Sequence, residues 1–141
     1  MKKFDLGLFL GKWYEVARIR NSFEPEMTNV TAQYILNTDG TIQVINMGYV
    51  GGKKRQITGL AKRTDLDNIL SVSFFPGVYS NYKVLAIGNN YEYALVGGDS
   101  ETYLWILSRT TEIDRKAFTD LVSIAMSAGY RSDLLILTEQ N

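Results

Sequence analysis

The 141-residue sequence contains no cysteine and no histidine. Without cysteine there is no disulfide framework and no thiol nucleophile. Without either residue type there is no zinc finger, imidazole base or haem-type histidine ligand. An excess of one charge is missing too, because 15 Lys and Arg balance 15 Asp and Glu, and this argues against the electrostatic footprint of a nucleic-acid-binding protein. We therefore expect no metal, no other cofactor and no nucleic-acid partner.

Long apolar runs are absent as well, since no stretch approaches the roughly 20 apolar residues of a membrane-spanning helix. Met1-Lys2-Lys3 begins like a secretory signal, but Asp5 interrupts it, and no cleavage site or lipid-accepting Cys follows. We expect a soluble chain that is cytoplasmic, unless a signal has been removed, in which case it belongs in the cell envelope (periplasm or outer membrane). Membrane association is expected only if a lipoprotein signal was removed.

Proline is scarce, with two residues, whereas glycine and tyrosine are common, with 12 and 9. Apolar and polar residues alternate from Gly11 to Arg109, and short turn signals separate segments rich in Val, Ile, Thr, Tyr and Phe. These features predict an all-β protein, an eight-stranded up-and-down antiparallel barrel, with a two-sheet sandwich as the alternative. The predicted strands are Lys12–Arg20, Val30–Asn37, Thr41–Tyr49, Lys54–Thr64, Ile69–Phe75, Tyr82–Ile87, Tyr91–Val96 and Tyr103–Ser108.

The C-terminal segment has the apolar spacing of a helix instead of the alternation of a strand. Apolar residues at helical spacing predict a helix over 112–128, with Thr111 and Asp114 as its N-terminal cap pair and Gly129 after its end. Because the last two barrel strands are apolar on both faces, we expect this helix to pack outside the barrel against them. Residues 134–137 predict a short ninth strand, and the whole chain, 1–141, is expected to form a single domain.

One parity of each strand faces the barrel interior. The inner faces assigned in this way are apolar and aromatic, with several phenols and one amide, which suits an acyl chain with a polar head group. Tyr79, near the mouth, and the basic cluster 53–55 are candidate contacts for that head group. The other predicted ligand-binding residues are Ala32, Tyr34, Val44, Asn46, Ile57, Val72, Phe74, Tyr82, Val84, Tyr93, Leu95 and Trp105.

In an up-and-down barrel the first strand begins at the end where the eighth strand finishes. Trp13 and Arg109 therefore lie at the same end, where a guanidinium over an indole is favourable. We expect this end to be closed and the rim with loops 21–29, 51–53, 76–81 and 97–102 to be the mouth. The residues assigned to the closed end are Gly11, Trp13, Asn90, Tyr91 and Arg109.

Three segments resemble the motifs of the lipocalin family. Gly11-Lys12-Trp13 is similar to its first motif, Asn90-Tyr91 stands at its second, and the run Tyr103-Leu104-Trp105-Ile106-Leu107-Ser108-Arg109 is similar to its third. The resemblance covers nearly the whole chain and is to the apolipoprotein D-like, bacterial outer-membrane branch. The chain departs from that branch by having Asn89-Asn90 in place of Thr-Asp and by lacking the acylated Cys.

This resemblance implies a binding, storage or transport protein for a small hydrophobic or amphipathic ligand, such as a fatty acid or a lysophospholipid, with membrane biogenesis or repair as a setting. Two alternatives are a lipocalin-fold enzyme acting on a hydrophobic small molecule and a filled barrel that works through protein contacts. The sequence has no G-x-S-x-G motif and no phosphate-binding glycine loop, so we do not expect an enzyme. A monomer or weak homodimer is expected.

Overall fold

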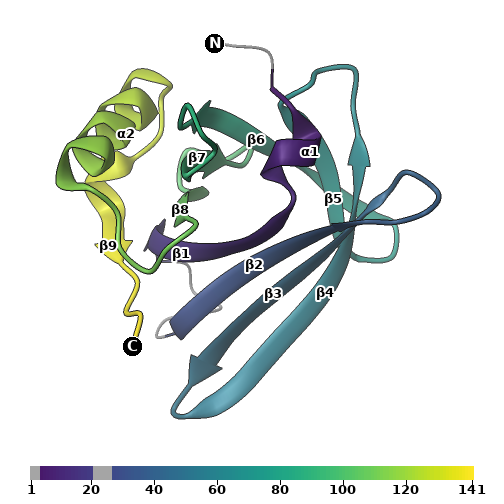
Figure 1. Cartoon of the computed structure of the whole chain (residues 1–141), viewed down its shortest axis with the longest axis horizontal. Helices are drawn as coiled ribbons and strands as arrows, with labels where there is room; N and C mark the ends of the chain where they lie inside the picture. The colour runs from purple at the N-terminus through teal and green to yellow at the C-terminus, as the bar shows by residue number, and fades with distance from the viewer. Residues whose placement is uncertain (1–3, 21–26) are drawn as a thin grey trace.

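The computed structural model describes residues 4–20 and 27–141, and it contains a closed antiparallel barrel (Figure 1). Each strand pairs with the next in the chain, and β1 pairs with both β8 and β2, which closes the ring. The predicted barrel is therefore confirmed, and the sandwich alternative is wrong. The strands are β1 (Gly11–Ile19), β2 (Thr28–Leu36), β3 (Ile42–Val50), β4 (Lys53–Arg63), β5 (Ile69–Phe75), β6 (Val78–Ile87), β7 (Tyr93–Gly97) and β8 (Leu104–Ser108).

Four further elements flank the barrel: α1 (Leu6–Phe9), α2 (Arg115–Ser127), the 3-10 helix η1 (Ser132–Leu134) and β9 (Leu135–Leu137). The predicted C-terminal helix and ninth strand are confirmed, whereas α1 was not predicted. The helix begins later than expected because Asp114, not Thr111, is its N-cap: the Asp114 carboxylate accepts a hydrogen bond from the backbone N of Ala117 at 3.2 Å. Residues 21–26 of the predicted mouth loop lie outside the described residues.

Helix α2 covers the outer wall of the barrel beside β7 and β8 (Figure 1). It buries Ala117, Leu121 and Ala125 against apolar side chains of β1, β7 and β8, which confirms that the helix packs outside. The wall thus separates an interior cluster from an outer cluster under α2. The fully or nearly buried outer-cluster residues are Val16, Ala17, Ile19, Leu95, Leu104, Ile106, Leu121 and Ala125.

The predicted inward orientation of Tyr93 and Leu95 is wrong. Both pack in the outer cluster, while Ala94 and Val96 occupy the interior. The prediction carried the alternation on from Tyr91, but Tyr91 adopts a left-handed backbone with φ of 54°, and β7 begins only at Tyr93. Because side chains alternate with a period of two, one irregular residue reverses the face of every residue that follows.

Residues 135–141 complete the wall beside β1. Strand β1 pairs with β2 over Gly11–Tyr14 and with β9 over Ala17–Ile19. Beyond β9, the side-chain amide of Gln140 donates to the backbone oxygens of Glu15 and Val30, at 2.8 and 2.9 Å. The C-terminal segment therefore joins β1 to β2 where their described pairing stops.

An arginine–tryptophan contact lies at the centre of the end of the barrel that the sequence predicts to be closed. The Arg109 guanidinium carbon lies 3.7 Å from the centroid of the Trp13 ring, which is 0% exposed. The indole N–H of Trp13 donates to the Phe9 carbonyl at 2.8 Å. Arg109 also donates hydrogen bonds to the carbonyl oxygens of Leu8, Phe9, Leu10, Lys12 and Tyr91.

The other residues assigned to the closed end also take part in it. Gly11 has φ of +102°, and a Cβ there would come within 3.4 Å of the Arg109 Nη1, so glycine meets both a conformational and a spatial requirement. The Tyr91 hydroxyl accepts a hydrogen bond from the Asp5 backbone N at 2.8 Å, which fixes the start of α1. Asn90 lies in the adjoining turn, where its backbone N donates to Glu92.

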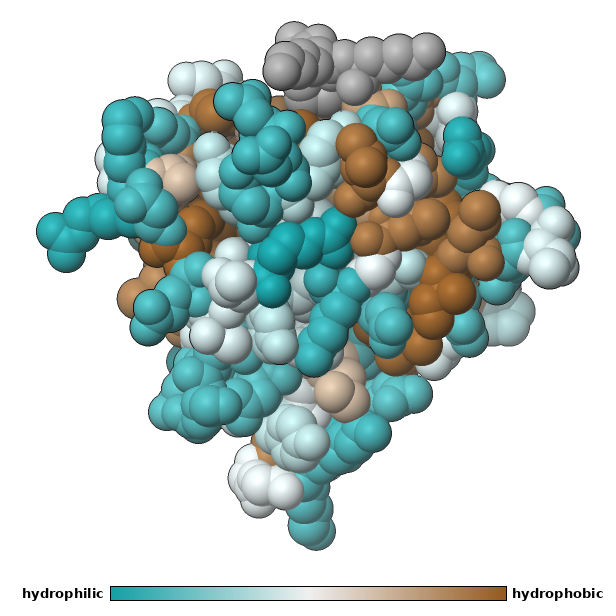
Figure 2. All heavy atoms as spheres, viewed as in Figure 1, coloured by the Kyte–Doolittle hydropathy of each residue, from teal (hydrophilic) through white to brown (hydrophobic). Residues whose placement is uncertain are grey.

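Apolar side chains gather on one outer surface near this end. Figure 2 shows them to the right of the view, over α1 and the adjoining end of β2. Leu8, Ile35 and Leu36 are exposed in these two elements. This surface lies outside the barrel and takes no part in its interior.

Replacing Arg109 with Ala should lower the free energy of unfolding by about 2–4 kcal/mol, because five carbonyl acceptors and the Trp13 ring lose a charged partner. Urea denaturation followed by circular dichroism measures the change. Arg63→Ala, at an exposed position at the end of β4, is the matched control and should stay within about 0.5 kcal/mol of the parent. Equal losses for both variants would contradict the proposed role of the closed end.

Candidate ligand-binding site

Two tyrosines span the barrel interior. Strands β2 and β6 stand opposite each other in the eight-stranded ring, and the hydroxyl groups of Tyr34 on β2 and Tyr82 on β6 are hydrogen-bonded to each other. On the α1 side of this pair, the Phe9 ring lies 5.1 Å from the Tyr34 ring and 5.2 Å from the Trp13 ring. The Tyr34–Tyr82 pair is therefore the layer nearest the mouth in a cluster of packed aromatic rings that fills the closed half of the barrel.

Half of the ten predicted lining residues that face the interior are buried in its core. Ala32, Val44, Val72 and Val84 belong to the buried interior cluster, together with Phe4, Leu6 and Phe9 from the N-terminal segment. Their predicted inward orientation is confirmed. They fill the barrel, however, and do not line an open space.

The inward-facing residues nearer the mouth retain solvent exposure. Asn46 pairs with Ile57 across the β3–β4 ladder, and Ile57 is 40% exposed although it shares the face of the buried Ala61. Phe74 and Trp105 are half-buried and contact the interior cluster. We refer to the inward-facing, partly accessible residues Asn46, Ile57, Phe74, Tyr82 and Trp105 together as the mouth chamber.

Gly59 allows the Phe74 ring to turn into the mouth chamber. A Cβ at position 59 would lie 2.6 Å from Cδ1 of Phe74 and 2.7 Å from the Ser73 carbonyl oxygen. No side chain fits between these atoms, so the absence of one at position 59 sets the position of the ring. The barrel wall is therefore shaped to present an aromatic surface here.

Tyr79 does not lie where the sequence predicted it. It is part of β6, not a loop, and its ring lies 5.0 Å from the Nζ of Lys62. Lys62 pairs with Ser71 on the outward parity of its strand, next to the inward Ala61, so Tyr79 belongs to the outer face. The predicted basic cluster 53–55 is exposed at the start of β4, on the mouth rim.

Sequence reasoning missed two charged residues in the interior. The β1–β8 ladder has a bulge between Glu15 and Ala17, which turns both Val16 and Ala17 outward and brings Arg18 to the inner face beside Trp105. Simple alternation from Trp13 would have placed Arg18 outside. Nothing in the sequence marks the bulge, so no local signal could have located this arginine.

Glu15 and Arg18 form a buried ion pair joined to the C-terminal segment. The Arg18 Nη1 lies 2.9 Å from the Glu15 Oε2, and the Thr138 hydroxyl donates to the same oxygen at 2.7 Å. Arg18 Nη1 also donates to the Met27 carbonyl oxygen at 3.3 Å. An ion pair with this burial needs several hydrogen bonds to offset its desolvation; these contacts satisfy Glu15 Oε2 and Arg18 Nη1 but not Arg18 Nε.

Burial keeps the tyrosine pair uncharged. Desolvation raises the pKa of Tyr34, and the negative charge of Glu15 raises it further, against the lowering effect of the hydrogen bond from Tyr82. Desolvation and the neighbouring Tyr34 raise the pKa of Tyr82 well above its ordinary value. Both phenols are therefore neutral hydrogen-bonding groups at physiological pH.

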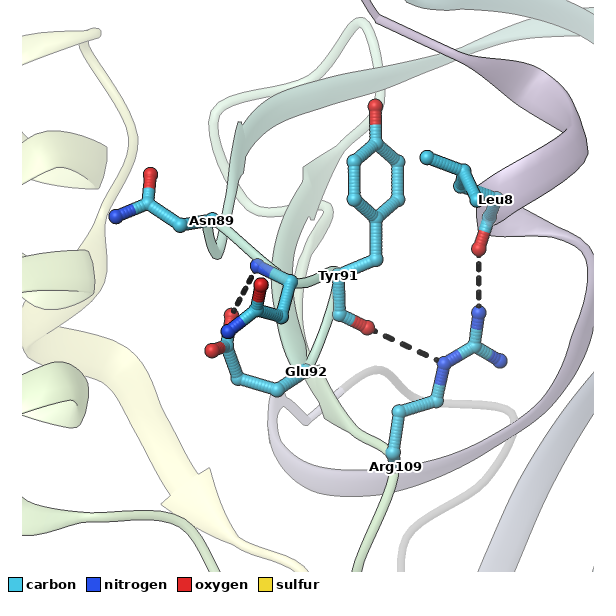
Figure 3. A pocket seen from close by; sticks show the side chains of 6 residues that line it. Leu8, Asn89, Tyr91, Glu92 and Arg109 are labelled. Carbon is cyan, nitrogen blue, oxygen red and sulfur yellow. Dashed lines mark hydrogen bonds between the residues drawn. The ribbon is translucent and has the colours of Figure 1, made fainter.

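A surface pocket at the closed end is a structural junction. In Figure 3 the Arg109 side chain donates to the carbonyl oxygens of Tyr91 and Leu8, at 3.3 and 2.9 Å. The Glu92 carboxylate accepts from the Asn90 backbone N at 3.3 Å. The polar groups of this pocket therefore hold α1 and the turn before β7 together.

The described residues contain neither a metal-binding cluster nor a helix that could span a membrane. Across 4–20 and 27–141, no group of three or more acidic side chains is arranged to hold a metal ion. No helix within those ranges is long and apolar enough to cross a membrane.

The barrel is closed, has eight strands and turns aromatic side chains inward, and an Arg–Trp contact lies at its closed end. These features are typical of a small-molecule-binding barrel of the lipocalin type. The chain belongs to the lipocalin family, since the family model for a lipocalin-like domain matches residues 4–140. Lipocalins are generally binding or transport proteins for small hydrophobic molecules.

Curated relatives are similar over nearly the whole chain. The outer membrane lipoprotein Blc of Vibrio cholerae is 39% identical, with 97% of this chain and 83% of that protein covered. The protein of the same name from Escherichia coli K12 is 38% identical, over 99% of this chain and 81% of its own length. Mouse apolipoprotein D is 32% identical, over 99% and 78%. These relatives support the resemblance found in the sequence.

Solved structures agree on the fold. The cockroach allergen Per a 4 superposes with a TM-score of 0.78 at 20% identity, covering 98% of this chain and 89% of that one. Lobster apocrustacyanin A1 gives a TM-score of 0.77 at 15% identity, covering 96% and 79%. At such identities the likeness is one of fold alone.

The tyrosine pair should make stability depend on alkaline pH. A phenol whose pKa is raised in the folded state contributes stability that is present below its unfolded pKa of about 10 and is lost as the pH rises above it. The free energy of unfolding should therefore fall as the pH rises above about 10, by up to about 1.4 kcal/mol per pH unit for each buried phenol. Urea denaturation at several pH values measures this fall.

The double variant Tyr34→Phe with Tyr82→Phe should show a shallower fall, because it lacks both groups with raised pKa. Tyr79→Phe, on the outer face, is the matched control and should keep the parent's pH dependence. Identical curves for the parent and the double variant would show that these phenols are not shielded.

Proposed function

We propose that this protein binds and carries single-chain lipids, fatty acids or lysophospholipids, in the mouth chamber. The observation that carries the proposal is the contrast within the barrel: inward-facing residues of the closed half are packed, whereas Asn46, Ile57 and Trp105 near the mouth remain accessible. The membership of the chain in a family of small-molecule carriers supports the same function.

The number of CH₂ groups that a bound lipid buries sets the apolar contribution to its affinity. Each buried CH₂ group contributes about 0.8 kcal/mol, so roughly ten of them contribute about 8 kcal/mol before the cost of association. Micromolar affinity requires about 8 kcal/mol net. Apolar contact alone therefore falls short of tight binding once those costs are counted, and contacts with the head group become important.

A place in the cell envelope, with a role in membrane biogenesis or repair, extends this proposal. Its support is the similarity to proteins of Vibrio cholerae and Escherichia coli that are named outer membrane lipoproteins. We further propose that the chain is a single domain and acts as a monomer or a weak homodimer.

Trp105 should report on ligand binding. Titration with dodecanoate or a lauroyl lysophospholipid should quench or blue-shift its fluorescence, because this half-buried indole lines the mouth chamber. Trp105→Phe should abolish most of the response, since the remaining Trp13 is fully buried at the closed end. Absence of any spectral change with both lipids, together with absence of binding by calorimetry, would refute the carrier function.

Ile57→Asn should weaken binding of the same lipids by about tenfold, because it replaces an apolar contact worth about 1–2 kcal/mol in the chamber. The neighbouring Thr58→Asn points to the outer face and is the matched control, for which affinity should not change. Calorimetry gives both dissociation constants. If the two variants bind equally well, the ligand does not lie in the mouth chamber.

A further inference from the structure

Arg18 is a charged side chain placed among the apolar residues of the barrel interior. It is 6% exposed, and the β1 bulge sets it on the inner face beside Trp105. Charged residues are rarely buried to this extent unless their donors are used. We therefore consider which of the three guanidinium nitrogens of Arg18 have hydrogen-bond acceptors.

Only one corner of the Arg18 guanidinium is occupied within the described chain. All its hydrogen bonds there use Nη1: to Glu15 at 2.9 Å, to the Met27 carbonyl at 3.3 Å and to Thr138 at 3.5 Å. Its Nε is buried and has no hydrogen-bond partner. A buried donor without an acceptor is unfavourable, and such groups are uncommon in folded proteins.

The unused edge has a defined chemical preference. In a guanidinium group, the N–H of Nε and one N–H of Nη2 point in parallel along the same edge. This pair of donors matches two oxygens of a carboxylate or a phosphate. Because Nη1 is held by Glu15 and by the Met27 carbonyl, the Nε–Nη2 edge is fixed in orientation.

We propose that the Nε–Nη2 edge of Arg18 is the subsite for the two-oxygen anionic head of the lipid, a fatty-acid carboxylate or a lysophospholipid phosphate. This inference rests on the proposed carrier function. Strands β1 and β8 stand opposite β5 and β4 in the ring, so a lipid with its head at Arg18 extends its chain across the mouth chamber toward Phe74 and Ile57. The head is then bound inside the barrel wall and not by the exposed basic residues of the rim.

Glu15 is compatible with an anion at this site. Its carboxylate contacts Nη1, on the far corner of the guanidinium from the Nε–Nη2 edge. The incoming anion therefore lies closer to the positive charge of Arg18 than to the negative charge of Glu15, and attraction at short range exceeds repulsion at longer range. Glu15 acts as a positioning residue that fixes the guanidinium.

The competing explanation is that Arg18 only fastens the C-terminal segment, because Glu15 and Arg18 both contact Thr138. A fastening role affects the stability of the barrel but does not distinguish between head groups. Comparison of ligands that share a chain and differ in their head therefore separates the two explanations.

Calorimetry at about pH 8, where a carboxyl group is ionised, would compare dodecanoate, lauroyl lysophosphatidate and dodecanol. We expect the parent to bind at least one of the two anionic lipids about tenfold or more tightly than dodecanol. Arg18→Gln should remove that advantage, with about a tenfold loss for the anionic lipid and less than about a twofold change for dodecanol. A loss confined to dodecanoate identifies the carboxylate, and a loss confined to the lysophosphatidate identifies the phosphate.

Two further variants keep the test decisive. Arg18→Lys retains the charge but lacks the two-donor edge, so it should lose most of the preference even if Arg18→Gln does not fold. Thr138→Val breaks the contact with Glu15 without touching the edge, so it should lower the urea midpoint and leave the preference intact. Dodecanol bound as tightly as both anions by the parent, or an equal loss for all three probes in Arg18→Gln, overturns the subsite alone. Failure of the parent to bind any probe, dodecanol included, overturns the carrier function and the subsite with it.

Discussion

The contact between Arg109 and Trp13 is the constraint on which the rest of the barrel depends. It connects the end of β8 to the start of β1, and through its carbonyl hydrogen bonds it holds α1 across the floor. Helix α1 in turn supplies Phe9, whose ring packs against Tyr34. The position of α1 at the closed end thus influences where the Tyr34–Tyr82 pair lies. The pair separates the packed closed half of the barrel from the residues of the mouth chamber.

Much of this arrangement was predictable because it follows from local periodicity and from strand order. Alternation located all eight strands, and helical spacing located α2. The position of Trp13 at the start of the first strand and of Arg109 after the last was enough to place both at one end. Helix α1 was missed because it has only four residues, and its stability comes from burial of Leu6 and Phe9, which is a tertiary effect.

The interior was less predictable because its assignment depends on parity. Alternation correctly placed Tyr34, Val84 and Trp105 inside, but it failed wherever the backbone departs from a regular strand. The left-handed Tyr91 reversed the face of β7, and the bulge in β1 brought Arg18 inward. Neither irregularity has a glycine or proline at its position to mark it, so the sequence pattern does not reveal them. The irregularity at Tyr91 lies at the closed end, and the β1 bulge lies beside Trp105 of the mouth chamber. Regular strands at these two places would turn other side chains inward.

The C-terminal segment has a consequence for how the protein is made. Residues 135–141, which are synthesised after all eight barrel strands, join β1 to β2 and close a gap beside the first of those strands. Contacts this far apart in sequence slow folding, because the loop entropy is lost before the contact forms. During translation the edge of β1 at Ala17–Ile19 is therefore unpaired until residues 135–141 have been synthesised and have docked. An open strand edge is prone to pairing with other chains, so synthesis and docking of residues 135–141 protect the newly made barrel from aggregation.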